Sequence, residues 1–314
     1  MKYFQILFGI FCLNLNASYE ITVLATNISN YGGFGEWSFS ALYESDKESI
    51  LFDTGFHEDT VLHNAKVLNK DLSKVEKVIL SHFHSDHTGG LIKLRKTYKP
   101  FNKNAFKNVY VTRGFFAQRY TASGDLVGPG NYLDANKFKK DAEGEGITFI
   151  ILDSHAEIAK DLFATGTVLR TDEYYNGPKG LLVRDKKSNK LIEDIIIDDQ
   201  SAGMLTKSGW IMMSGCGHSG VINTAKKLQS IHNVPIYGAI GGFHLFQASD
   251  DVIDKTAIWL KNAGMEKFMG GHCTGIYAAE RVADMIGIKR DDLSHTAIGS
   301  VLTRDLSIIR SSVE

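Results

Sequence analysis

Cysteines, long apolar runs and clusters of one charge are all scarce in this sequence, and each absence excludes a class of protein. The chain has 314 residues but only three cysteines, too few for a disulfide framework. Its 35 basic and 36 acidic side chains nearly cancel, and no basic run is interleaved with aromatics, so nucleic acid is not an expected partner. Asp-Thr-Gly occurs once, at 53–55, whereas an aspartic protease needs two aspartates that share a proton.

The first seventeen residues, MKYFQILFGIFCLNLNA, differ in kind from the rest of the chain. A single lysine precedes an apolar stretch from about Phe4 to Leu13, and small or polar residues follow it. This order is typical of a secretory signal peptide, so we expect cleavage after Ala17, a mature domain over 18–314 and a periplasmic or secreted location. The apolar run is too short to span a bilayer comfortably, which predicts no stable membrane anchor. A buried N-terminal strand is the alternative.

Strand and helix patterns alternate along the mature chain, which predicts a single α/β domain. β-Branched and aromatic residues that end in Gly or Asn turns favour strands, and apolar residues at helical spacing favour helices. The expected strands are 19–27, 35–44, 48–55 and 75–80, and a helix is expected over 58–68. The segment at about 98–180 is less regular and has glycine-containing loops. We interpret it as an elaboration whose aromatic residues form either a local core or a wall over a site.

Four apolar runs in the chain end in a turn that contains histidine. The histidines in these turns are His82, His84, His87, His218, His244 and His272. Polar groups at the carboxyl ends of strands gather at one edge of an α/β sheet. Four such strand ends in one sheet would therefore bring the imidazoles to a single place.

The segment 82-HFHSDH-87 has three histidines and an aspartate within six residues. Imidazole and carboxylate ligands suit zinc, iron or manganese, and a purely structural role for such a dense group is the weaker alternative. Side chains alternate in an extended segment, so His82 and His84 can face one metal ion while Asp86 and His87 face a second. The motif therefore predicts two adjacent divalent metal ions, with zinc as the first candidate.

Residues elsewhere in the sequence complete this hypothesis. His218 and His272 are the expected further metal ligands, and His244 is a candidate ligand, substrate contact or proton donor. Asp53 ends a predicted strand in 51-LFDTG-55, where its carboxylate could hold a ligand imidazole from behind. Cys216, two residues before His218, is expected behind the ligands, either with a chemical role or as a small buried side chain.

These motifs resemble those of the metallo-β-lactamase superfamily. The general likeness rests on 82-HFHSDH-87, 50-ILFDTG-55, His218 and His272. GCGHSG, IGGFHL, GGHCTG and 298-IGSVLTRDL-306 resemble the subgroup typified by the archaeal dihydropterin ribofuranosyl-aminobenzene phosphate synthase. The resemblance implies a four-layered αββα sandwich with a dinuclear metal site at its edge. In many hydrolases of the superfamily an aspartate bridges the metals, but here 209-GWIMMSGC-216 ends in Cys216, so the bridging ligand is open.

A dinuclear site would need no nucleophilic side chain, because metal ions supply hydroxide at neutral pH. We therefore expect a secreted hydrolase that uses a metal-bridging hydroxide on an ester, lactone, amide or phosphoester in a small-molecule substrate. Asp86 would position the hydroxide, and His244 would contact the substrate or leaving group. A dihydropterin-type transferase is one alternative, and it needs a cation for phosphate, such as Arg113, Arg119 or Lys179. A non-catalytic metal-binding protein is the other; the sequence does not indicate an oligomeric state.

Overall fold

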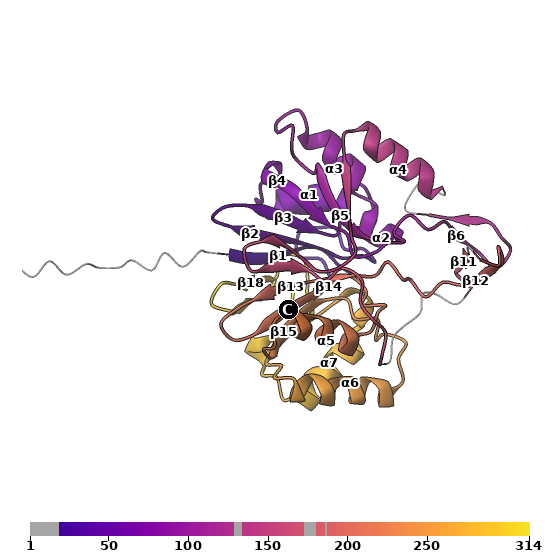
Figure 1. The fold of residues 1–314 in the computed structure, drawn as a ribbon. Coiled ribbons are helices and arrows are strands. Elements are labelled where there is room, and N and C mark those ends of the chain that lie inside the picture. The colour runs from indigo at the N-terminus through magenta and orange to yellow at the C-terminus, as the bar shows by residue number, and fades with distance from the viewer. Residues whose placement is uncertain (1–18, 129–133, 173–179, 186) are drawn as a thin grey trace, which may run out of the picture.

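Two β-sheets pack face to face, and helices cover both outer faces (Figure 1). The structure is a computed structural model, and it describes residues 19–128, 134–172, 180–185 and 187–314. The predicted signal peptide at 1–17 lies outside these ranges. This architecture is the four-layered αββα sandwich that the sequence motifs imply. Within the described ranges, no helix is both long enough and apolar enough to cross a membrane.

The first sheet has eight strands, in the order β19-β18-β1-β2-β3-β4-β5-β8. Its strands are β1 (Tyr19–Ala25), β2 (Ser40–Ser45), β3 (Ser49–Phe52), β4 (Val75–Ile79), β5 (Asn108–Thr112), β8 (Thr148–Leu152), β18 (Val301–Thr303) and β19 (Ile308–Ile309). The helices of this half are α1 (Thr60–Val67), α2 (Ser85–Thr88), α3 (Leu91–Tyr98) and α4 (Ala135–Gly144), with the 3₁₀ turn η1 (Leu72–Lys74). The strands and helices expected before residue 100 are therefore present, although β2 starts later than expected.

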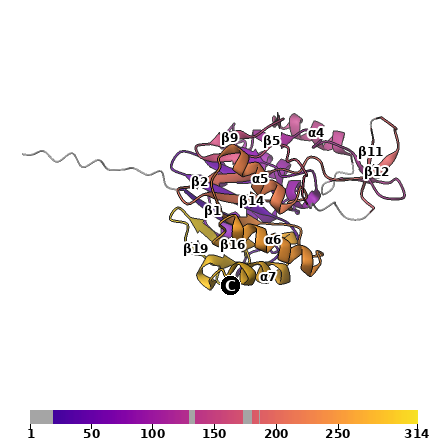
Figure 2. The same ribbon diagram turned by 60° about the horizontal axis from the view of Figure 1, so that its bottom comes forward.

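The second sheet has seven strands, in the order β17-β16-β15-β14-β13-β10-β9. Its strands are β9 (Ala156–Ala159), β10 (Leu162–Ala164), β13 (Ser201–Leu205), β14 (Trp210–Ser214), β15 (Ile236–Gly241), β16 (Lys267–Gly270) and β17 (Leu293–Ser294). Helices α5 (Val221–Ile231), α6 (Asp250–Asn262) and α7 (Ile276–Ile286) form the layer beside it (Figures 1 and 2). The 3₁₀ turns η2 (His272–Thr274) and η3 (Arg290–Asp292) complete this half.

The central strands are buried on both faces, which explains their continuous apolar runs. Along β14, Ile211 and Met213 pack into the core between the two sheets. Trp210 and Met212 point the opposite way, into the core beneath the outer helices. Alternate side chains of one strand thus enter two apolar cores, one on each face of the sheet. Because both faces are apolar, the polar groups of the site must lie beyond the strand ends.

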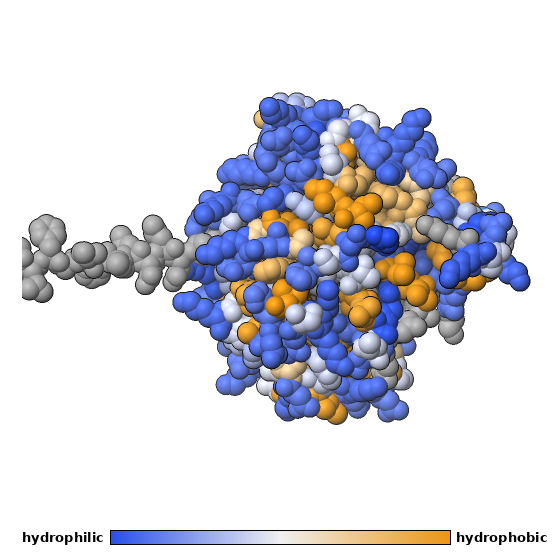
Figure 3. All heavy atoms as spheres, viewed as in Figure 1, coloured by the Kyte–Doolittle hydropathy of each residue, from blue (hydrophilic) through white to orange (hydrophobic). Residues whose placement is uncertain are grey.

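A third sheet of four strands, in the order β12-β11-β6-β7, lies at one end of the sandwich (Figure 1). Its strands are β6 (Arg119–Tyr120), β7 (Leu126–Val127), β11 (Leu182–Arg184) and β12 (Leu191–Glu193). The elaboration is thus not the single segment 98–180, because β5, β8, β9 and β10 belong to the main sheets and β11 and β12 follow that segment. Figure 3 shows apolar side chains gathered on the face beside this sheet.

The aromatic residues of the elaboration contribute chiefly to a local core. The ring of Phe115 lies 5.1 Å from that of Phe83, and Phe138 lies 5.2 Å from Phe83 on another side. Phe83 therefore anchors the segment 82-HFHSDH-87 in this core, as the alternation of side chains along an extended segment requires. Tyr132, Tyr174 and Tyr175 lie outside the described residues.

Gly89 makes a close backbone contact that holds helix α2 against the loop after β3. A Cβ at Gly89 would lie 1.8 Å from the carbonyl oxygen of Phe56, whereas a Cβ at Gly144 would meet nothing within 4 Å. We expect Gly89→Ala to lower the free energy of unfolding by about 1–3 kcal/mol, as overpacking does. Gly144→Ala, the control in α4, should raise it by up to about 1 kcal/mol. Urea denaturation measures both, and equal effects would contradict this packing argument.

Candidate metal centre

The six histidines of the predicted cluster lie at strand ends that come from both main sheets. β14, β15 and β16 are parallel neighbours in the second sheet, and the turns after them carry His218, His244 and His272. The fourth turn follows β4, which belongs to the first sheet. The expectation of a single sheet was therefore wrong, because the convergence depends on stacking two sheets with these strand ends at the same edge.

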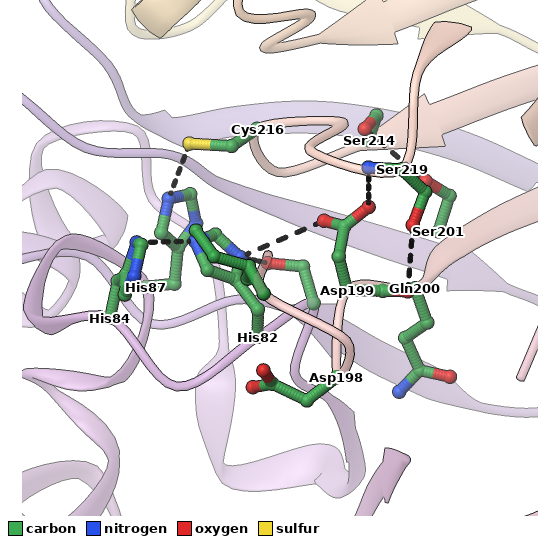
Figure 4. Close-up of polar contacts among 12 residues, drawn as sticks. His82, His84, His87, Asp198, Asp199, Gln200, Ser201, Ser214, Cys216 and Ser219 are labelled. Atoms are coloured by element: carbon green, nitrogen blue, oxygen red, sulfur yellow. Dashed lines mark hydrogen bonds and ion pairs between the residues drawn. The ribbon is translucent and has the colours of Figure 1, made fainter. Parts of the chain in front are cut away.

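His82, His84 and His218 form the first group of ligand-type atoms, which lie within 4.8 Å of one another. Nε2 of His82 lies 2.9 Å from Nδ1 of His84, as Figure 4 shows. Nε2 of His84 is buried and has no hydrogen-bond partner among the described residues. Burial and the neighbouring His87 hold the pKa of His82 well below its usual value, so this imidazole is neutral, the form that binds metals.

Asp86, His87, Cys216 and His272 form the second group. Oδ2 of Asp86 lies 3.4 Å from Nε2 of His87 and 3.3 Å from Nε2 of His272. Sγ of Cys216 lies 3.2 Å from each of the same two nitrogens. The thiol was expected behind the ligands, but it lies among them, at the strand end where an aspartate was missing.

Charge in the second group is balanced without a metal ion by shifted pKa values. Burial opposes ionisation of Asp86, yet His87 and His272 hold the pKa of its carboxyl well below the usual range. Burial also opposes protonation of His87, but the carboxylates of Asp86 and Asp53 raise its pKa well above the ordinary value. Metal binding here would therefore release protons, since a ligand imidazole must be neutral.

Asp53 supports both groups through one carboxylate. Its Oδ2 lies 2.7 Å from Nδ1 of His87 and accepts a hydrogen bond from Oγ of Ser81, also at 2.7 Å. Ser81 has one hydroxyl proton, so Nδ1 of His82, 2.9 Å from that hydroxyl, must donate to it. His82, and His87 once it has released its second proton, then carry a proton on Nδ1 and have a lone pair on Nε2 for a metal ion. This contact has the geometry proposed for Asp53 from its position at a strand end.

Asp199 lies behind the first group and was missed in the sequence. Its Oδ1 is 4.0 Å from Nδ1 of His82, and its Oδ2 accepts a hydrogen bond from the backbone of Ser219 at 2.8 Å (Figure 4). Burial raises the pKa of Asp199 to about 6. The available signal was the acidic pair in 194-DIIIDDQ-200, which follows an apolar run directly before β13.

A buried ion-pair network fixes the backbone between His82 and His84. Arg119 of the third sheet pairs with Asp194 and Asp198, each at 2.6 Å, and donates to the carbonyl of Phe83 at 3.0 Å. Asp198 accepts from the amide of Phe83 at 2.8 Å. Both polar groups of Phe83 are thereby held, which couples the third sheet to the motif.

A cavity of about 370 Å³ opens over the two groups. Asp86, Cys216, His218 and His244 contribute to its lining. The apolar part of the lining is supplied by Trp37, Phe56, Phe83, Val127, Leu181 and Phe246. His244 lies near the first group, with its ring 4.5 Å from that of His218, and it faces the same cavity. The arrangement thus combines metal-type donors with an apolar enclosure for a small molecule.

An αββα sandwich with imidazole, carboxylate and thiol donors at its edge defines a class of proteins built to hold divalent metals. The family model described as metallo-beta-lactamase superfamily matches residues 38–100. A relative from Methanocaldococcus jannaschii, 7,8-dihydropterin-6-methyl-4-(beta-D-ribofuranosyl)-aminobenzene-5'-phosphate synthase, is 30% identical over 82% of this chain and 88% of its own. The chain therefore belongs to the metallo-β-lactamase superfamily.

Solved structures agree with this assignment. Tm1679, described as a metal-dependent hydrolase of the beta-lactamase superfamily, superposes with a TM-score of 0.74 at 27% identity and covers 90% of this chain and 98% of its own. YhfI from Bacillus subtilis, a metallo-beta-lactamase fold protein, gives a TM-score of 0.54 at 17% identity over 91% of this chain and 99% of its own. The second likeness concerns the fold alone.

The Arg119 network predicts a large loss of stability when its cation is removed. Arg119→Met would leave Asp194 and Asp198 buried without their partner, so we expect a loss of about 3–5 kcal/mol in the free energy of unfolding. The control is Arg113→Met, because Arg113 pairs with Asp153 at the surface and its loss should cost at most about 1 kcal/mol. Chemical denaturation compares the two variants. Similar losses would show that the buried network does not stabilise the motif.

Proposed function

We propose that this protein is a metal-dependent hydrolase acting on an ester, lactone, amide or phosphoester bond of a small molecule. The observation that supports this most is the meeting of two donor groups at the wall of one apolar cavity. Three imidazoles in one group, and a carboxylate, two imidazoles and a thiol in the other, suit zinc, with iron or manganese as alternatives. Nδ1 of His84 lies 2.9 Å from Nε2 of His82, so these two nitrogens are close enough to bind the same ion.

In this proposal, His82, His84 and His218 hold one metal ion, and Asp86, His87, Cys216 and His272 hold the other. Bound divalent ions would lower the pKa of water at the site and polarise the oxygen of the bond under attack. The protein's part is to fix the donors and exclude solvent. Asp53 and Ser81 set the tautomers of His87 and His82, and the Arg119 network fixes the backbone between His82 and His84.

The position of Asp86 favours a role in the site over a role as a helix cap. Helix α2 begins after His84, and its N-cap makes no side-chain hydrogen bond. The Asp86 carboxylate is directed instead at His87 and His272, and it is 14% exposed, on the cavity side. We propose that it binds metal and orients the attacking water.

His244 is the proposed contact to the substrate or leaving group. It follows β15, lines the cavity and has a positive φ of 49°, a conformation that a non-glycine residue adopts only when its surroundings enforce it. A ring nitrogen facing the cavity can donate a proton to a departing oxygen or nitrogen. Such a group assists hydrolysis most where the leaving group is an alkoxide or an amine, which leaves poorly without a proton.

A transferase of the dihydropterin type is the second candidate, and the synthase relative is the observation that favours it. Its substrate would carry a phosphate that needs a cation. Arg119 is buried and already paired with two carboxylates, and Arg113 is exposed and paired with Asp153. Lys179 lies outside the described residues. The described cations therefore favour the hydrolase.

Asp86→Ala separates these roles by experiment. We expect the variant to lose at least about a hundredfold in kcat on a susceptible ester, and its metal content to fall from near two ions to near one by elemental analysis. The matched control is Asp134→Ala, because Asp134 caps α4 by accepting from the amides of Asn136 and Lys137. That control should lose about 0.5–2 kcal/mol of stability and keep metal and turnover. If Asp86→Ala behaves like the control, the dinuclear proposal fails.

We also propose that the protein is exported and loses its first seventeen residues. Intact mass spectrometry of the extracytoplasmic protein should find Ser18 as the first residue. Leu7→Arg should block export, because a charge in the apolar segment prevents its recognition as a signal. A cytoplasmic wild-type protein that retains Met1 would contradict this proposal and favour the transferase.

A further inference from the structure

Two partly exposed aromatic side chains flank the metal-type donors inside the cavity. Trp37 is 50% exposed and Phe246 is 40% exposed, and both line the cavity. Their rings meet edge to face with centroids 5.2 Å apart. Trp37 also lies 5.1 Å from the His272 ring, and Phe246 lies 5.3 Å from the His244 ring. Apolar ring surface is thus presented directly beside the reacting groups.

Hydrogen bonds preorganise this aromatic surface. The carboxylate of Glu36, next to Trp37, accepts from the amide of Phe56 and from the hydroxyl of Thr60, both at 2.7 Å. It also accepts from the hydroxyl of Ser38 at 2.7 Å, so both neighbours of Trp37 are fixed. On the other side, the amide of Phe246 donates to the carbonyl of Cys273 at 3.2 Å. A rigid aromatic surface loses little entropy when a ligand covers it.

The charges around the cavity disfavour a substrate that carries an anionic group away from the donor groups. In the described part of the lining, the one side-chain cation is Arg119, and Asp194, Asp198 and the Phe83 carbonyl already occupy its donors. Arg119 and its two carboxylate partners, Asp194 and Asp198, together carry a net negative charge. A phosphate or carboxylate distant from the metal-type donors would therefore be desolvated without a partner, which is costly.

We infer that the cavity takes uncharged esters or lactones that carry an aryl group, which packs against Trp37 and Phe246. This inference rests on the proposed hydrolase function and adds its substrate class. An aryl group fits because aromatic rings gain from edge-to-face contacts in addition to the burial of apolar area. The small volume, about 370 Å³, suits an aryl group of one or two rings and a short acyl chain rather than a large conjugate.

The test compares phenyl acetate and 2-naphthyl acetate with ethyl acetate in the metal-loaded, full-length enzyme. Trp37→Ala and Phe246→Ala should each lower kcat/KM for the aryl esters about tenfold more than for ethyl acetate, and mainly through KM. Dividing each variant's value by the wild-type value cancels the intrinsic reactivity of each ester. Phe101→Ala, at a side chain that is 80% exposed and outside the cavity lining, is the control and should change neither.

A second arm measures binding without turnover. Calorimetric titration with 2-naphthol, a product, should show binding to the wild type that weakens about tenfold in Trp37→Ala. In the activity assay, 4-acetoxyphenyl phosphate should be at least about tenfold poorer than phenyl acetate in kcat/KM, because its phosphate finds no cation.

The outcomes separate the two proposals. If no ester is hydrolysed but 2-naphthol binds at Trp37, the hydrolase fails and the aryl site stands. If the esters are hydrolysed but the variants affect aryl and ethyl esters equally, the aryl site is overturned and the hydrolase stands. A preference for the phosphate-bearing ester would also overturn the inference.

Discussion

The whole centre depends on one buried carboxylate, that of Asp53. It accepts hydrogen bonds from the amide and hydroxyl of Ser81 and lies 2.7 Å from Nδ1 of His87. Through Ser81 it also determines which nitrogen of His82 carries the proton, so one residue orients an imidazole in each donor group. The close packing around Asp53 leaves no room for a side chain at Gly215, where a Cβ would lie 2.5 Å from the Asp53 carboxylate. The strand end of β14 can approach only because that position has no side chain.

The sandwich holds this centre in backbone conformations that isolated peptides avoid. Asp53, His244 and His272 have φ values of 54°, 49° and 47°, in the left-handed region that costs an ordinary residue roughly 1–2 kcal/mol. Backbone hydrogen bonds between neighbouring strands continue past the strand ends and offset this cost. The amide of Gly271 donates to the carbonyl of Gly241, and the amide of Asp53 donates to the carbonyl of Ile79, each at 2.9 Å. Strain of this kind at residues that face the cluster is what a preorganised site requires.

The sequence could predict what is local and could not predict what depends on distant segments. The alternation in 82-HFHSDH-87 and the apolar runs before His218 and His272 are local, so the strands and the histidine-bearing turns followed from them. The αββα class followed from the resemblance of these motifs to a known superfamily. The division of these turns between two sheets did not, because either sheet could supply such a run. Asp199 and the pairing of Arg119 with Asp194 and Asp198 were missed because partners 75 and 79 residues apart leave no local pattern.

Cys216 ties the choice of metal to the character of the cavity. Burial raises the pKa of its thiol well above the ordinary value, so within this apolar wall the thiolate becomes stable only beside a cation. A thiolate donor favours zinc or iron over magnesium or calcium, which prefer oxygen ligands. Burial at the thiol also strengthens its electrostatic interaction with a bound cation. The apolar cavity and the soft donor therefore support one another, and the proposed hydrolysis of uncharged substrates would use both.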